Sequence, residues 1–233
     1  MIQDGRNVEL VRRVAGRLGP LVDRVVFLGG AATCLLVTDP GAAPPRPTRD
    51  VDVVIEVAST VEYMGKLSDE LRAIGFHEDA EEGAPLCRWM VEGIKVDVMP
   101  TSGSILGFTN RWYGAALAHA VRVSLPGGQT IRLVSGPHFL ATKLEAFAGR
   151  GQGDHAASHD LEDLVAVVDG RPEIEEEIAA ADVELRSYLA EKIGELLADP
   201  AFMDALPGHL PGDPASQARL PLLVARIGRI ATR

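Results

Sequence analysis

The sequence has few cysteines, few aromatic residues and no long hydrophobic run. Its 233 residues include two cysteines, Cys34 and Cys87, and only 5% aromatic side chains. Both cysteines lie in apolar stretches without metal-ligand spacing, which indicates buried free thiols and a reducing compartment. No apolar run approaches the roughly 18–20 residues of a membrane-spanning helix, and the first residues contain no apolar signal core. We therefore expect a cytoplasmic protein with no membrane partner.

Positive charge is also scarce. Lysine and arginine total 23 against 33 aspartates and glutamates, which gives a formal net charge of −10. Proteins that bind nucleic acid without regard to sequence carry a basic face, so this balance argues against that class. The negative net charge is still compatible with an RNA that binds one local basic patch. The 46% hydrophobic content predicts a globular fold with a core, in one large domain or two small ones.

The most informative stretch covers residues 46–57 and reads RPTRDVDVVIEV. Val51 and Val53 alternate with Asp50 and Asp52, which predicts a β-strand with both acids on one face, roughly 6–7 Å apart at the backbone. Two carboxylates this close repel each other unless a positive charge lies between them. Carboxylate oxygens suit Mg²⁺ or Mn²⁺. The alternative is an edge strand whose solvent face is acidic.

A glycine pair precedes this strand. The stretch RVVFLGG, residues 24–30, predicts a short buried strand that ends in Gly29 and Gly30 and continues into a helix. Glycine at this bend lets the backbone approach a phosphate, and the following helix presents free N–H groups to it. An ordinary strand-to-helix turn has the same pattern.

A third acid follows in a predicted hairpin. Residues 86–91 and 94–99 flank Glu92-Gly93, a tight-turn signal, and Asp97 lies between valines on the second strand. This geometry would bring a third carboxylate to the Asp50–Asp52 pair. Arg88, on the first strand of the hairpin, would contact a phosphate or pair with an acid.

Other stretches predict further elements of an α+β fold. Hydrophobic periodicity favours helices at 7–18, 60–75 and 107–119, and a hairpin at 121–134. From residue 135 the pattern becomes helical, with Ser158 as a helix cap and a last helix at 215–230.

This ordered set of motifs resembles the DNA polymerase β-type nucleotidyltransferase superfamily, and most closely its AbiEii-like minimal members from toxin–antitoxin systems. The residues that carry the resemblance are Gly29, Gly30, Ala32, Leu35, Arg46, Thr48, Asp50 and Asp52. The resemblance implies a mixed-sheet, palm-like core at residues 1–134 and a helical domain at 135–233 that completes the active-site cleft.

Two later stretches, FLATKLEAFAGRG (139–151) and SHDLEDLVAVVDGR (158–171), are similar to the region after the acids in the same family. By that resemblance Lys143 contacts the triphosphate, and Asp160 or Asp163 orients Lys143 or lies near the acceptor. Both residues could instead have purely structural roles: Lys143 can extend from a core helix to solvent, and Asp160 can stabilise a helix dipole.

The resemblance implies a metal-dependent enzyme that moves a nucleoside monophosphate from a nucleoside triphosphate to an acceptor hydroxyl and releases pyrophosphate. The acceptor would be RNA such as tRNA, with an antitoxin protein as partner. Alternatively it would be a small aminoglycoside-like molecule, whose positive charge an acidic protein attracts. A non-catalytic nucleotide-binding module is the third possibility. The implied catalytic residues and ligands of two Mg²⁺ or Mn²⁺ ions are Asp50, Asp52 and Asp97, and the implied nucleotide-binding residues are Gly29, Gly30, Thr48, Lys143, Asp160 and Asp163.

Overall fold

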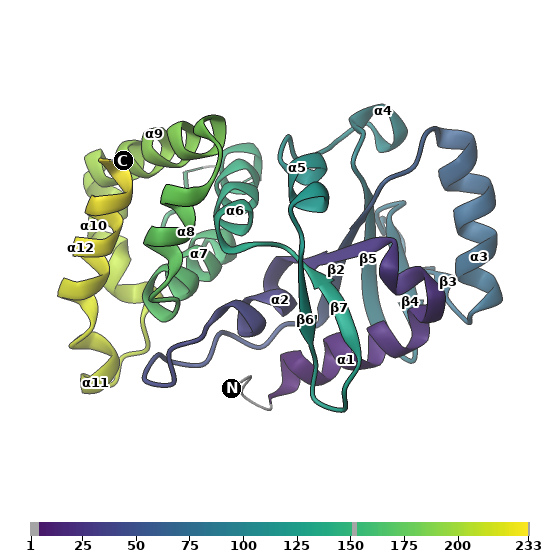
Figure 1. The fold of residues 1–233 in the computed structure, drawn as a ribbon, viewed down its shortest axis with the longest axis horizontal. Helices are drawn as coiled ribbons and strands as arrows, with labels where there is room; N and C mark the ends of the chain where they lie inside the picture. Colours follow the sequence, from purple (N-terminus) through teal and green to yellow (C-terminus); the bar gives the residue numbers. More distant parts are fainter. Residues whose placement is uncertain (1–4, 151–152, 233) are drawn as a thin grey trace. The chain divides into compact units, whose positions relative to one another are not determined.

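The computed structural model describes residues 5–150 and 153–232, and these form a mixed α/β structure (Figure 1). Within these two ranges, no helix combines the length and the hydropathy that a membrane crossing requires. Cys34 and Cys87 are both free thiols, as expected, but only Cys87 is buried and Cys34 is partly exposed.

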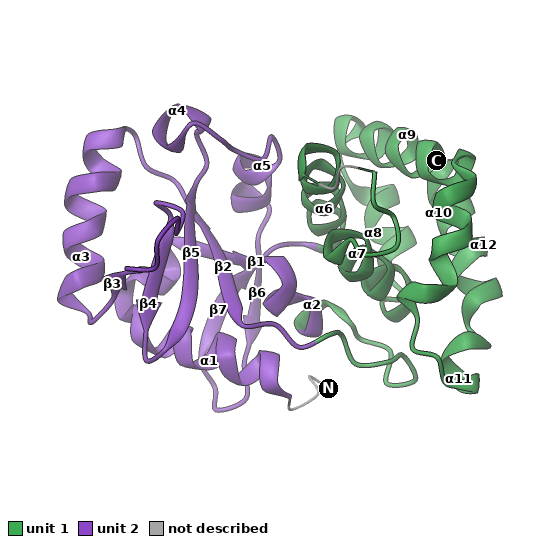
Figure 2. Cartoon of the chain, turned by 180° about the vertical axis from the view of Figure 1, so that it is seen from behind, with its two compact units in different colours: residues 1, 35–46, 136–233 green, residues 2–34, 47–135 purple. Residues whose placement is uncertain are grey.

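The chain folds into two compact units, which Figure 2 shows in different colours. The sheet unit, purple in Figure 2, comprises Ile2–Cys34 and Pro47–Ser135. The helical unit, green in Figure 2, comprises Leu35–Arg46 together with the chain from Gly136 onward. Residues 1–134 were expected to form one domain, whereas the proline-rich segment Leu35–Arg46 groups with the helices.

Seven strands of the described residues form one mixed sheet in the order β3-β4-β5-β2-β1-β7-β6. The central strand β2 runs parallel to β5 and antiparallel to β1. The expected alternation is present in β2, because Val51 and Val53 are buried while Asp50 and Asp52 are partly exposed on the other face. The strands are β1 (Val25–Leu28), β2 (Asp50–Ile55), β3 (His77–Glu78), β4 (Arg88–Val91), β5 (Ile94–Pro100), β6 (Val121–Ser124) and β7 (Thr130–Leu133).

Helices cover this sheet. Helix α1 (Arg6–Leu18) packs against β2 and β5, and the 3₁₀ turn η1 (Gly19–Asp23) leads from it to β1. Helix α2 (Gly29–Leu36) begins directly at the glycine pair. The π-type turn η2 (Glu62–Leu67) continues into α3 (Ser68–Ala73).

The helix expected at residues 107–119 is only half present. A short helix, α4 (Gly103–Leu106), ends at Gly107, which has the left-handed conformation that commonly terminates helices. The Asn110 side chain then accepts a hydrogen bond from the backbone N–H of Trp112, and α5 (Tyr113–Ala118) follows. The apolar residues of 107–119 follow a helical spacing, but Gly107 ends α4 and the helical backbone resumes only at Tyr113.

The helical unit has the helices expected after residue 135. Ser158 caps α7, since its hydroxyl accepts the backbone N–H of Leu161 at 3.3 Å. The single helix expected at 215–230 is two helices, because Pro221 lacks the N–H that a helix interior needs and lies in the first turn of the second one. The elements are α6 (Gly136–Arg150), α7 (His159–Gly170), α8 (Ile174–Ala180), α9 (Val183–Ala198), α10 (Pro200–Ala205), η3 (Leu206–His209), α11 (Pro214–Gln217) and α12 (Leu220–Ala231).

Candidate active site

Strand register places the three predicted acids on one face of two neighbouring strands. In the parallel pair β2–β5, Asp52 lies beside Asp97, and in the antiparallel hairpin β4–β5, Arg88 lies opposite Asp97. Paired residues share a face, and neighbouring strands lie about 4.7–4.9 Å apart. Asp50 is on the same face because it precedes Asp52 by two residues. Arg88, Asp97 and Asp52 therefore form a row across β4, β5 and β2.

Arg88 binds both carboxylate oxygens of Asp97. Its Nε donates to Oδ1 at 2.8 Å and its Nη2 donates to Oδ2 at 2.7 Å. The hydrogen bond to Asp97 raises the pKa of Arg88, and the charge of Asp50 raises it further. Of the two roles considered for Arg88, the structure shows the ion pair with an acid, and that acid is the predicted third metal ligand.

A buried hydrogen-bond chain holds Asp50. The Thr48 hydroxyl donates to Oδ1 of Asp50 at 2.5 Å, and the Thr48 backbone N–H donates to the side-chain oxygen of Asn7 at 3.0 Å. Thr48 and Asn7 are both buried. Asn7 was not among the predicted site residues, although its place is visible in the sequence: it occupies the apolar stripe of α1 that also contains Val11 and Val14.

Gly29 lies directly against Asp52. Its φ is 71°, a conformation that favours glycine, and a Cβ atom added there would lie 1.8 Å from Oδ2 of Asp52. Gly30 follows in the first turn of α2 and is buried. The glycine pair thus brings the start of α2 close to the carboxylate of the central strand.

The three acids fit a metal site in their chemistry and backbone positions. Their carboxylate oxygens are the ligands that Mg²⁺ and Mn²⁺ prefer, and they share one sheet face. Arg88, however, binds both oxygens of Asp97. In the part of the chain that the structure describes, no three Asp, Glu, His or Cys side chains converge to hold a metal ion. The two-metal site therefore stays a prediction.

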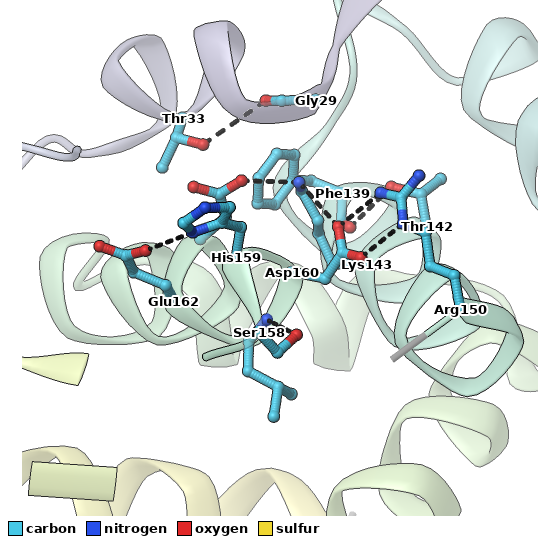
Figure 3. A network of polar contacts seen from close by, with 12 residues as sticks. Gly29, Thr33, Phe139, Thr142, Lys143, Arg150, Ser158, His159, Asp160 and Glu162 are labelled. Carbon is cyan, nitrogen blue, oxygen red and sulfur yellow. Dashed lines mark hydrogen bonds and ion pairs between the residues drawn. The ribbon is translucent and has the colours of Figure 1, made fainter. Parts of the chain in front are cut away.

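A second charged cluster lies between α6 and α7 of the helical unit (Figure 3). The buried Lys143 ammonium donates to Asp163 at 2.6 Å and to Asp160 at 3.2 Å. Arg150 binds both oxygens of Asp160 at 3.0 and 2.9 Å. Arg46 binds both oxygens of Asp163 at 3.1 and 3.2 Å. Each acid thus pairs with Lys143 and with one arginine.

Arg150 is a member of this cluster that the sequence pattern did not indicate. Lys143 and Arg150 are seven residues apart, which is two helical turns, so they face the same way on α6. Burial raises the pKa of Asp160, but the hydrogen bond from Arg150 and the positive charges of Lys143 and Arg150 together lower it by more, and Asp160 stays ionised at neutral pH. Because Lys143 is balanced by acids in this state, its contact with a triphosphate stays a prediction.

Comparison with solved structures shows a relation of fold. An antigenic nucleotidyltransferase-like protein of Paracoccidioides brasiliensis matches with a TM-score of 0.52 and 23% sequence identity, over 87% of this chain and 93% of that one. The chain has a nucleotidyltransferase-like fold. A candidate nucleotidyltransferase of H. pylori matches at 11% identity and a TM-score of 0.45, over 97% and 92% of the two chains.

The match to the Paracoccidioides protein confirms the predicted α+β fold class of a nucleotidyltransferase-like core followed by helices. No protein-family model and no curated protein sequence matches the chain. The AbiEii-like branch within this fold stays a prediction.

Proposed function

We propose that the protein is a nucleotidyltransferase, which moves a nucleoside monophosphate from a nucleoside triphosphate to an acceptor hydroxyl. The observation that carries the proposal is the placement of Asp50, Asp52 and Asp97 on one face of β2 and β5, with Gly29 against Asp52. Three carboxylates on one sheet face would supply the oxygen ligands for a divalent metal, which assists displacement at phosphorus.

Each residue has a role in this proposal. Asp50, Asp52 and Asp97 would hold Mg²⁺ or Mn²⁺, which when bound stabilises the entering and leaving oxygens of the displacement at phosphorus. Thr48 orients Asp50 through its hydroxyl. Gly29 and Gly30 leave room for phosphate oxygens, whose charge the helix N-terminus favours. The remaining proposed nucleotide ligands, from the helical unit, are Lys143, Asp160 and Asp163.

Two acceptor classes remain. RNA, such as tRNA, follows from the resemblance to AbiEii-like enzymes, as does restraint by an antitoxin protein. An aminoglycoside-like small molecule is favoured by the net charge of −10, which attracts a polycation. The two readings share the same acids and the same reaction at phosphorus, so one experiment can test both.

The test supplies each of the four α-³²P-labelled nucleoside triphosphates with Mg²⁺ or Mn²⁺, together with total RNA or a panel of aminoglycosides. Label on RNA supports the first acceptor class, and label on an aminoglycoside supports the second. Asp52→Asn should abolish transfer and leave the fold intact. Asp69→Asn is the matched control, since Asp69 is an exposed acid of the same unit that pairs with Arg72. Bound nucleotide without transfer to either acceptor would instead support the non-catalytic module.

A further inference from the structure

Arg88 binds the carboxylate of Asp97, which the proposed function assigns as a metal ligand. The guanidinium forms two parallel hydrogen bonds, and the two side chains are only 23% and 12% exposed. Such bidentate pairs are the strong form of charge-assisted hydrogen bonding. A divalent cation that binds Asp97 therefore competes with the Arg88 guanidinium for the charge of the same carboxylate.

The same row of residues explains why the positive charge of Arg88 lies beside Asp97 in the metal-free protein. Asp97 lies beside Asp52 in register, and Asp50 is two residues away on the same face. Carboxylates at such positions repel one another unless a positive charge offsets them. Arg88 is directly opposite Asp97 on β4 and supplies that charge from within the chain.

We propose that Arg88 is an internal counter-ion that holds Asp97 in the metal-free protein and is released from it when a divalent cation binds. Arg88 thereby lowers the affinity of the site for a free cation. This inference rests on the proposed function, because it takes Asp97 as a metal ligand.

The first experiment measures Mn²⁺ affinity without nucleotide, from the electron paramagnetic resonance signal of free Mn²⁺. Arg88→Met removes the charge and keeps much of the apolar stem, so the variant should bind Mn²⁺ about tenfold more tightly or better, as loss of a competing bidentate pair implies. Arg88→Lys keeps the charge but loses the fork geometry, and its affinity should lie between the two. Adding Asp97→Asn to Arg88→Met should remove the gain.

The matched control is Arg24→Met. Arg24 also pairs with an acid of the sheet unit, Glu70, at 2.6 Å. Arg24 precedes the start of β1, whereas Leu28, the residue paired with Asp52, lies at the other end of that strand. Its loss should leave Mn²⁺ affinity unchanged.

A second measurement follows Arg88 itself. The ¹⁵Nε–H resonance of Arg88, assigned by its absence in Arg88→Lys, should shift and lose its protection from exchange when Mg²⁺ saturates the protein. An unchanged resonance at saturation overturns the inference. So does equal Mn²⁺ affinity in wild type and Arg88→Met; if the wild type then still transfers nucleotide, the proposed function stands alone. If neither protein binds Mn²⁺ even with nucleotide present, both the inference and the metal-dependent function fail.

Discussion

Replacing Gly29 by alanine tests whether close approach to Asp52 is what the glycine pair provides. An added Cβ would lie 1.8 Å from Oδ2, 2.6 Å from Cγ and 2.8 Å from Cβ of Asp52. Because Asp52 Cβ is attached directly to the β2 backbone, rotation of the carboxylate alone cannot relieve all three contacts. Alanine would also have to adopt a φ of 71°.

The cost of Gly29→Ala has two parts. The positive φ costs about 1–2 kcal/mol, of which roughly 0.4–1 kcal/mol is returned because alanine restricts the unfolded chain. Overpacking against Asp52 adds about 1–3 kcal/mol. We therefore expect Gly29→Ala to lower the free energy of unfolding by about 1–4.5 kcal/mol and to abolish nucleotidyl transfer.

Gly75→Ala is the matched control, because Gly75 also has a positive φ, 93°, but nothing lies within 4 Å of an added Cβ. It should cost about 1 kcal/mol, the conformational part alone. Urea unfolding followed by tryptophan fluorescence suits both variants, since the two tryptophans, Trp89 and Trp112, are both buried in the sheet unit. Equal losses in the two variants, or retained transfer in Gly29→Ala, would refute the reasoning.

Three further predictions concern buried charged groups and thiols. Lys143→Met should weaken nucleotide binding, which calorimetric titration measures, and unchanged nucleotide affinity would remove Lys143 from the site. In urea unfolding, the same variant should lower the free energy of unfolding by only about 1–3 kcal/mol, because Asp160 and Asp163 each keep an arginine partner. The pKa of Asp160 is lowered from its ordinary value of 3.8, so the ion pairs of Asp160 stabilise the fold fully at pH values above 3.8. This stabilisation is lost as the pH falls through the lowered pKa. Asp160→Asn should therefore flatten the dependence of unfolding free energy on pH below about pH 4, and a profile like that of the wild type would contradict this. Burial raises the pKa of Cys34 to about 12 and that of Cys87 to about 11, so a thiol reagent at pH 8 should react slowly with the folded protein and fully after unfolding in urea. Rapid reaction of both thiols in the folded protein would contradict these raised pKa values.

Local patterns in the sequence were sufficient to predict the elements that carry the candidate site. The alternation of valine and aspartate in β2 predicts a strand with Asp50 and Asp52 on one face, and the structure has that strand. The turn signal at Glu92-Gly93 predicts the β4–β5 hairpin, and Ser158 caps its helix as expected. These patterns are reliable because side-chain periodicity and turn chemistry act between residues close in the chain.

Only the tertiary structure decided which partners these residues have. Arg88 and Asp97 are nine residues apart, and their pairing depends on hairpin register rather than on composition. The segment Leu35–Arg46 groups with the helical unit, where Arg46 binds Asp163, 117 residues later in the chain. Gly29 contacts Asp52 because β1 and β2 are antiparallel with Leu28 paired to Asp52. Contacts of this kind follow from the packing and register of segments far apart in sequence, and no local periodicity encodes them.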